Sequence, residues 1–156
     1  LQRWYIPVIE SCNHIKVADT KPDSFKPREF YTGGGPSQHE RITGSVTAID
    51  VTTGKEVGKA ETRYPMLGGL LATPDLVFAG SPDGEVFALD AKSLDKLWSF
   101  HTGSGVNAPP VTFTVDGKQY VAILAGVGGA WDKWFIDSTP ELKSMQPGSM
   151  LYVFAL

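Results

Sequence analysis

A repeat with an offset of 40 residues constrains the fold of this chain more than any other feature of its sequence. The segment GSVTAID at 44–50 is matched by GEVFALD at 84–90. In both copies apolar and polar residues alternate and an aspartate ends the run. A turn then leads into a second short strand, at 56–60 or 96–101. Each copy is therefore predicted to be a β-hairpin with an acidic residue at its mouth.

Two more apolar runs lie between the copies, at 70–73 and 76–80, on either side of Pro74-Asp75. One period then holds about four strands, and four strands in a period of this length are typical of a β-propeller blade. The sequence therefore predicts an all-β fold built from antiparallel four-stranded blades.

Further strands are expected near both ends of the sequence. Runs at 110–115 and 118–125 are joined by Asp116-Gly117, a strong hairpin signal, and residues 151–156 repeat the pattern of 86–89. With another strand expected at 3–7, we expect about three blades, with both ends of the sequence cut in the middle of a blade. Because a blade buries its faces only against neighbouring blades, we expect the remainder of a propeller or a second copy to cover the outer faces.

Two long segments, at about 10–42 and 126–147, do not follow the blade pattern. We interpret them as insertions within one domain that covers residues 1–156. Long connections between strands often carry function, so these segments are where a site is expected.

Composition excludes several classes of function. The 14 basic and 17 acidic residues are scattered, so no basic stripe is available for nucleic acid, and no apolar run is long enough to span a membrane. The three histidines share no metal-ligand spacing, and neither a Ser-His-Asp set nor a phosphate loop is present. The single cysteine, Cys12, is expected to be a half-buried small apolar residue rather than a reactive thiol.

Taken in order and spacing, eight stretches resemble the C-terminal region of the PQQ-dependent (quinoprotein) alcohol and methanol dehydrogenases. They are WYIP at 4–7, VTAID at 46–50 with TGK at 53–55, GGLLAT at 68–73, LVFAGSPDG at 76–84, LWSF at 97–100, PPVTF at 109–113, DGKQYVA at 116–122 and GVGGAW at 126–131.

The resemblance implies an eight-bladed periplasmic propeller that holds PQQ and a Ca²⁺ or lanthanide ion near its axis. Such an enzyme oxidises a small alcohol or an aldehyde and passes the electrons to a cytochrome c. The catalytic aspartate and most metal ligands of the family come from earlier blades. No catalytic or metal-binding residue is therefore assigned here, and this segment alone is expected to be inactive.

The resemblance also suggests which residues would face the cofactor. Leu67 stands where the family has a tryptophan close to the quinone, and it is followed by Gly68 and Gly69. Trp131 matches a second tryptophan near the cofactor cavity. Leu67 could equally be ordinary core, the glycines could only mark a bulge, and Trp131 could simply pack against neighbouring aromatic residues.

Three more candidates come from strand ends. Glu10 and Asn13 follow the strand at 3–7, where the family places a polar residue beside PQQ, although ungapped counting puts Ile9 at the position of an asparagine in methanol dehydrogenases. Asn107 is expected to begin a strand that faces the axis, or else to be a turn residue that bonds to its own backbone.

Other conspicuous residues are interpreted as structural. Trp98 is expected to lock one blade to the next, and Asp50 and Asp90 to cap turns rather than bind a metal. A second hypothesis is a non-catalytic propeller that serves as a protein-interaction scaffold. The Gly68-Gly69 run and the 126–131 segment favour the enzyme, whereas leucine in place of tryptophan at 67 favours the scaffold.

Overall fold

Both copies of the repeat form the predicted hairpins in the computed structural model, which describes residues 2–14, 16–17, 27–28, 38–127 and 138–156. The first copy ends β2 (Gln38–Asp50) and pairs with β3 (Glu56–Thr62). The second copy forms β6 (Glu85–Asp90) and pairs with β7 (Lys96–His101). A register irregularity interrupts both hairpins at equivalent places, between Ala48 and Ile49 and between Ala88 and Leu89, so the repeat extends to the backbone pairing.

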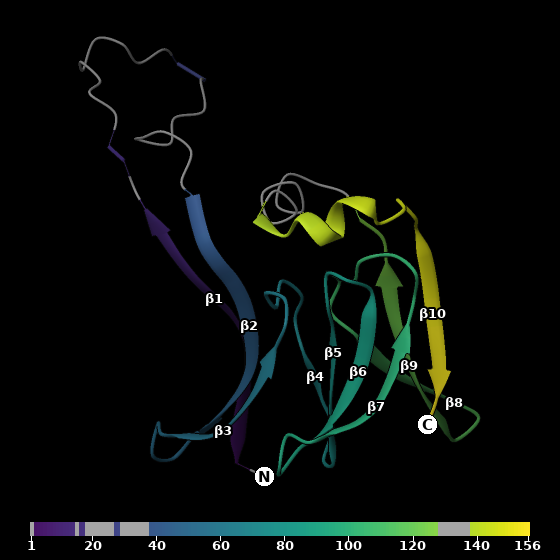
Figure 1. Cartoon of the computed structure of the whole chain (residues 1–156). Helices are drawn as coiled ribbons and strands as arrows, with labels where there is room; N and C mark the ends of the chain where they lie inside the picture. Colours follow the sequence, from purple (N-terminus) through teal and green to yellow (C-terminus); the bar gives the residue numbers. More distant parts are fainter. Residues whose placement is uncertain (1, 15, 18–26, 29–37, 128–137) are drawn as a thin grey trace.

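The strands form three antiparallel sheets that lie side by side (Figure 1). The first sheet has the order β1-β2-β3, with β1 spanning Arg3–His14. The second sheet has the order β4-β5-β6-β7 and adds β4 (Leu71–Ala72) and β5 (Leu76–Gly80). The third sheet has the order β10-β9-β8, with β8 (Val111–Val115), β9 (Lys118–Ala125) and β10 (Met150–Ala155).

The all-β prediction is confirmed, and each sheet corresponds to a propeller blade. The second sheet has the predicted four strands, whereas the first and third have three each within the described residues. A short 3-10 helix, η2 (Pro140–Ser144), precedes β10. No helix among the described residues has the length and apolar character that crossing a membrane would require.

The repeated aspartates cap equivalent turns, as predicted. Oδ1 of Asp50 accepts hydrogen bonds from the backbone amides of residues 52 and 53, and Oδ1 of Asp90 accepts them from residues 92 and 93. Asp and Asn side chains commonly close turns in this way. The fifth residue of each turn has a left-handed backbone, with φ of 69° at Gly54 and 64° at Leu94.

The first and second sheets pack face to face through small and branched apolar side chains. Val46 and Ala48 of β2 pack in one buried cluster with Val77 of β5 and Phe87 of β6. At the turn end of the sheets, the hydroxyl of Tyr5 donates a 2.6 Å hydrogen bond to the carbonyl oxygen of residue 91. The two sheets are therefore joined by apolar packing and by a polar contact at their edge.

Aromatic side chains fill much of the contact between the second and third sheets. The rings of Trp98 and Phe154 meet edge to face with centroids 5.0 Å apart, and Phe100 lies 5.5 Å from Tyr152. The hydroxyl of Tyr152 also donates a hydrogen bond to the carbonyl oxygen of Thr102. The prediction that Trp98 joins neighbouring blades is confirmed.

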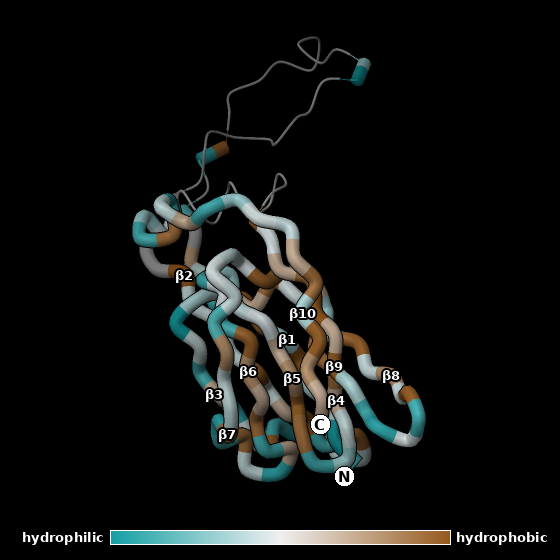
Figure 2. Tube along the Cα trace, turned by 90° about the vertical axis from the view of Figure 1, so that its right-hand side faces the viewer, coloured by the Kyte–Doolittle hydropathy of each residue, from teal (hydrophilic) through white to brown (hydrophobic). Residues whose placement is uncertain are grey.

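The opposite face of the third sheet is apolar and uncovered. Cross-strand pairing places six large side chains on this face, and their exposed fractions lie between 42% and 58%: Val111, Phe113, Val115, Leu124, Leu151 and Val153. Hydrophobic residues continue along the strands of this sheet in Figure 2. This uncovered face is the kind of surface that the sequence predicted a neighbouring blade or a second copy to cover.

Two predictions about the N-terminal region differ from the structure. Strand β1 continues to His14 and β2 begins at Gln38, so ten residues assigned to the 10–42 insertion belong to strands. The polar side chains there do not end the ladder, because backbone groups make its hydrogen bonds and the side chains of Ser11 and Cys12 are exposed. The expectation that Cys12 is half-buried is also wrong, because its side chain is exposed near the end of β1.

Candidate functional site

The predicted site residues that the structure describes lie toward one end of the strands. Strands β1, β3, β7 and β9 all end at the upper end in Figure 1, and the aspartate-capped turns and both chain termini are at the lower end. Antiparallel pairing imposes this arrangement, because alternate connections of a meander emerge at the same edge of the sheet. The upper end is therefore the candidate functional end of the molecule.

Two of these connections touch at the predicted glycines. A Cβ added to Gly68 would lie 3.1 Å from the carbonyl oxygen of Asn107, and a Cβ added to Gly69 would lie 3.0 Å from the Cβ of Pro109. Glycine therefore allows the β3–β4 connection to pack against the β7–β8 connection. We call residues 67–69 and 107–109 the glycine cradle, which brings four of the predicted cofactor residues together.

Leu67 and Asn107 differ in their surroundings within the cradle. Leu67 is half-buried. Asn107 precedes β8 by several residues, in the β7–β8 connection, and its side-chain oxygen is buried. The backbone next to Leu67 is anchored on the first sheet, because the amide of Met66 donates a hydrogen bond to the carbonyl oxygen of Val8.

Glu10 is engaged elsewhere. Its carboxylate forms an ion pair with Lys59 of β3 and accepts a 3.2 Å hydrogen bond from the hydroxyl of Ser45. The hydrogen bond from Lys59 is the main reason that the pKa of Glu10 lies below its ordinary value. These partners place the carboxylate on the face of the first sheet that is turned away from the second sheet, since the cross-strand partner of Lys59 is Thr47 rather than a core residue.

The other two sequence candidates are less fully placed. Asn13 lies in β1 opposite His39 of β2, next to a register irregularity. Trp131 lies outside the described residues. The structure thus gathers Leu67, Gly68, Gly69 and Asn107 and does not bring Glu10 into contact with them.

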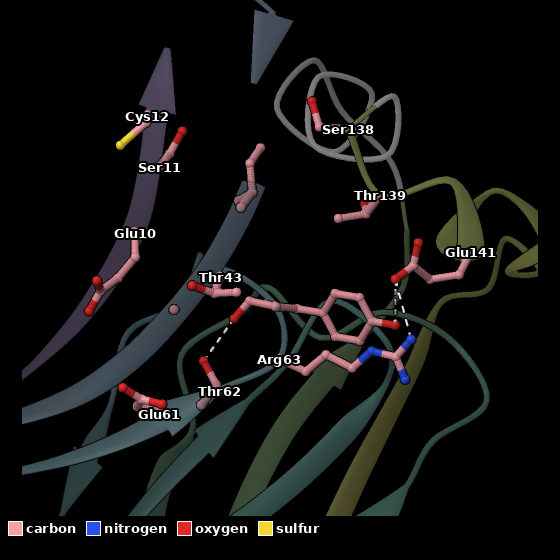
Figure 3. Close-up of a pocket in the computed structure, with 13 residues that line it drawn as sticks. Glu10, Ser11, Cys12, Thr43, Glu61, Thr62, Arg63, Ser138, Thr139 and Glu141 are labelled. Atoms are coloured by element: carbon pink, nitrogen blue, oxygen red, sulfur yellow. Dashed lines mark hydrogen bonds and ion pairs between the residues drawn. The ribbon is translucent and has the colours of Figure 1, made fainter. Parts of the chain in front are cut away.

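A groove of about 900 Å³ opens at the same end of the molecule (Figure 3). One side comes from the end of β1 and from β2, and the floor from the end of β3. The other side comes from the segment before and within η2. We call this space the polar groove; its lining residues are Glu10, Ser11, Cys12, Ile42, Thr43, Gly44, Glu61, Thr62, Arg63, Tyr64, Ser138, Thr139 and Glu141.

Glu141 closes one side of the polar groove. Its Oε1 lies 3.4 Å from Nη2 of Arg63 and 3.4 Å from the hydroxyl oxygen of Tyr64, which donates a hydrogen bond to it. Burial is the main cause of a pKa of Tyr64 above its ordinary value, so the hydroxyl keeps its proton at neutral pH. These contacts tie the segment before β10 to the β3–β4 connection.

Sequence reasoning missed the polar groove. Arg63 and Glu141 are 78 residues apart, and neither belongs to a motif. The available signal was indirect, namely that long connections of neighbouring blades emerge at the same end and must meet there. Within the described residues, no group of three or more His, Cys, Asp or Glu side chains is arranged to hold a metal ion.

No family model matches the chain. It is 43% identical over 119 residues to the quinoprotein alcohol dehydrogenase PedH of Pseudomonas putida, which covers 76% of this chain and 20% of that protein. It is 37% identical over 158 aligned positions to a quinoprotein ethanol dehydrogenase of Pseudomonas putida, covering 98% of this chain and 25% of the relative. The chain thus spans a fifth to a quarter of the length of these relatives.

Solved structures give the same result. A europium-containing methanol dehydrogenase superposes with a TM-score of 0.80 at 26% identity, over 99% of this chain and 31% of that chain. The quinohemoprotein alcohol dehydrogenase ADHIIG of Pseudomonas putida superposes with a TM-score of 0.77 at 28% identity, over 99% of this chain and 24% of that chain. The chain therefore belongs to the quinoprotein alcohol dehydrogenase family, and its three sheets are a segment of that family's β-propeller.

Proposed function

We propose that this chain forms one wall of the cofactor cavity in a PQQ-dependent alcohol dehydrogenase. The observation that carries the proposal is the glycine cradle, in which Leu67, Gly68, Gly69 and Asn107 meet although two separate connections supply them. Family membership supports the proposal that this cradle contacts PQQ, because the relatives are named as quinoproteins and alcohol dehydrogenases.

The residues of the cradle fit a flat cofactor on one side. PQQ, when bound, would accept the two electrons that an alcohol loses on oxidation. Leu67 would cover part of one face of the ring and exclude water from it, whereas a tryptophan would also stack on it. Gly68 and Gly69 would keep the β3–β4 connection against Asn107, and the contacts of Glu141 would hold the neighbouring segment in place.

Other features of the proposed enzyme reach beyond this chain. We propose that the ligands of a Ca²⁺ or lanthanide ion come mainly from other blades, since the described residues contain no such cluster. A small alcohol substrate, a cytochrome c electron acceptor and a periplasmic location are proposed by analogy with the family. The chain by itself is proposed to lack turnover.

A non-catalytic scaffold is the second candidate. It is favoured by the aliphatic side chain of Leu67 and by the engagement of Glu10 with Lys59, because both remove contacts that the resemblance implied for the cofactor. A scaffold and an enzyme segment differ in whether they bind PQQ, so one measurement separates them.

Substitution Leu67→Trp tests the cradle directly. An indole at this half-buried position should add a stacking surface, so we expect PQQ to bind about three- to tenfold more tightly than to the unsubstituted protein. Equilibrium dialysis against PQQ, with Ca²⁺ or La³⁺ present, measures the dissociation constant.

The matched control is Leu97→Trp, because Leu97 is 59% exposed on β7 of the second sheet. This variant adds the same indole at the outer strand and should leave the PQQ affinity unchanged. Equal affinity of the two variants, or no PQQ binding by any longer polypeptide that includes this sequence, would favour the scaffold.

A further inference from the structure

The β7–β8 connection, which supplies Asn107 to the glycine cradle, is held by two sheets. The amide of Val106 donates a 3.0 Å hydrogen bond to the carbonyl oxygen of Ser81, which directly follows β5 of the second sheet. The carbonyl oxygen of Gly105 accepts a 2.7 Å hydrogen bond from the amide of Gly126, which directly follows β9 of the third sheet. The backbone immediately before Asn107 therefore bridges the second and third sheets.

The side chain of Ser104 ties the β7–β8 connection to the other end of the β9–β10 connection. Ser104 is 8% exposed, and its hydroxyl donates a 3.0 Å hydrogen bond to the carbonyl oxygen of Gln146, shortly before β10. The fit is close, because a Cβ added to Gly105 would lie 2.7 Å from Cγ1 of Val127. Both ends of the β9–β10 connection therefore rest on the residues that precede Asn107.

The same β9–β10 connection reaches the other half of the glycine cradle through Glu141. The hydroxyl of Tyr64 donates a hydrogen bond to the Glu141 carboxylate, and Figure 3 shows the Arg63 guanidinium pointing toward that carboxylate. Because the ion pair is largely exposed, its contribution is small, whereas Tyr64 is 5% exposed and its hydroxyl needs an acceptor. Tyr64 lies three residues before Leu67, so this contact holds the backbone that leads into residues 67–69.

We propose that the β9–β10 connection positions both halves of the glycine cradle, with Ser104 and Glu141 as positioning residues. Ser104 would fix Asn107 through the backbone that joins them, and Glu141 would fix Gly68 through Tyr64. The two halves meet at close range, since a Cβ added to Gly68 would lie 3.1 Å from the carbonyl oxygen of Asn107. A misplacement of about 1 Å is enough to impair a preorganised site. The expected effect on PQQ rests on the proposed function, but the position of the cradle can be measured without a cofactor.

Amide hydrogen exchange on the unliganded protein tests the Ser104 contact. In Ser104→Ala, the amides of Val106 and Gly126 should exchange at least about fivefold faster, because the hydroxyl that ties their neighbours together is lost. The amide of Met66 should change by less than about twofold, because it lies in the other half of the cradle region.

The Glu141 contact should give the opposite pattern. In Glu141→Ala, the amide of Met66, which donates a hydrogen bond to Val8, should exchange at least about fivefold faster, and that of Val106 should change by less than about twofold. Glu141→Gln keeps an acceptor for the Tyr64 hydroxyl and should restore exchange at Met66 to within about twofold of the unsubstituted protein.

Three control variants separate positioning from general destabilisation. Ser99→Ala and Glu56→Ala make the same replacements at exposed positions of β7 and β3 and should leave these amides unchanged. Tyr5→Phe removes a 2.6 Å hydrogen bond between the first and second sheets at the opposite end of the molecule, so it should destabilise the fold without a selective effect on the cradle. Uniformly faster exchange along the chain in Ser104→Ala and Glu141→Ala, or no change at the named amides, would overturn the proposal.

Equilibrium dialysis against PQQ in the presence of Ca²⁺ measures the consequence for the cofactor. Ser104→Ala and Glu141→Ala should each weaken PQQ binding by about three- to tenfold, whereas Glu141→Gln and the three controls should weaken it by less than about twofold. Unchanged affinity in both positioning variants of a protein that binds PQQ would overturn the proposal. If the unsubstituted protein bound no PQQ, the proposed function would fail instead, because hydrogen exchange decides the positioning without a cofactor.

Discussion

The side chain of Asp50 stabilises a turn, and the pKa of its carboxyl group shows whether that turn has formed. Its Oδ1 accepts hydrogen bonds from the amides and hydroxyls of Thr52 and Thr53. These bonds, that from the Thr52 hydroxyl above all, lower the pKa of Asp50 from 3.8 to about 2. Because the folded-state pKa is depressed, the stability that this carboxylate confers is present above pH 3.8 and is lost as the pH falls toward 2.

We expect an NMR titration of the Asp50 carboxyl carbon to give a midpoint of about 2. Asp50→Asn keeps an acceptor for the turn but removes the titration. This variant should therefore show a weaker dependence of unfolding on pH in the acid range than the unsubstituted protein. A titration midpoint at the ordinary value of an aspartate would show that the turn bonds do not hold in solution.

Leu94 occupies a backbone conformation that favours glycine. Its φ is 64°, whereas the equivalent residue of the first copy is Gly54, with φ of 69°. The side chain is 5% exposed and packs toward Gly58, where an added Cβ would lie 3.2 Å from its Cδ1. A left-handed backbone costs a leucine about 1–2 kcal/mol, so burial of the side chain offsets that strain.

At position 94, the usual order of stability between an alanine and a glycine variant should be inverted. Both Leu94→Ala and Leu94→Gly lose the buried side chain, but only glycine relieves the backbone. Leu94→Gly should therefore be more stable than Leu94→Ala by about 1 kcal/mol in urea unfolding. At Leu89, buried in β6 with no positive φ, the usual order should hold, with alanine more stable than glycine. If the alanine variant were the more stable one at both positions, the backbone strain assigned to Leu94 would be contradicted.

At the scale of elements, Gly80 sets how closely the second and third sheets approach. An added Cβ at this end of β5 would lie 2.2 Å from Cγ1 of Val106, which is fully buried, and 3.3 Å from Cδ1 of Ile123 in β9. Neither neighbour can move without disturbing the core cluster that joins these sheets.

Gly80→Ala should therefore reduce the free energy of unfolding by about 1–3 kcal/mol. Gly148→Ala is the matched control, because an added Cβ there would lie 3.5 Å from the nearest atom and φ is not positive. Chemical denaturation of both variants measures the difference. Equal free energies of unfolding for the two variants would mean that the sheets can move apart at this edge without a loss of stability.

The sequence predicted elements well wherever the signal was local. Alternation, turn residues and the 40-residue repeat placed the strands of the second sheet within a few residues. The 10–42 insertion was drawn too long because polar residues in β1 and β2 look like a loop, although backbone pairing continues through them. The polar groove escaped prediction because contacts between distant connections create it, and no local pattern encodes such contacts. The helix η2 was missed although Pro140 and Glu141 in its first turn are local helix-start signals.

The candidate site residues were likewise predicted only in part. Leu67, Gly68, Gly69 and Asn107 were named from a resemblance, and the structure brings them together. The partners of Glu10 could not be foreseen, because Lys59 reaches it from another strand across Ser45. The resemblance therefore predicted which residues lie near one another at one end of the strands better than it predicted individual contacts.

At the scale of the whole molecule, the uncovered face of the third sheet is the main unsatisfied surface. Its six exposed side chains form a continuous apolar face rather than scattered positions. Such a face favours association with another apolar surface. When no other chain covers it, we expect the protein to sediment as species larger than a monomer at micromolar concentration.

Substituting Leu151 and Val153 together with lysine should shift the protein toward the monomer in sedimentation velocity. The control is Val51→Lys, because Val51 is 58% exposed but lies in the β2–β3 turn at the other side of the molecule. A monomeric unsubstituted protein, or equal effects of both sets of substitutions, would show that this face does not drive association.

The second sheet differs from its neighbours in one further respect: it is built from a single continuous stretch of 31 residues, 71–101, with only short connections. In the first and third sheets, one connection is much longer, from His14 to Gln38 and from Ala125 to Met150. Closing a connection of that length costs about 1.5 kcal/mol more in chain entropy than closing a turn of a few residues. During refolding, the middle sheet is therefore the least costly part to form, and it offers each flanking sheet an apolar face on which to assemble.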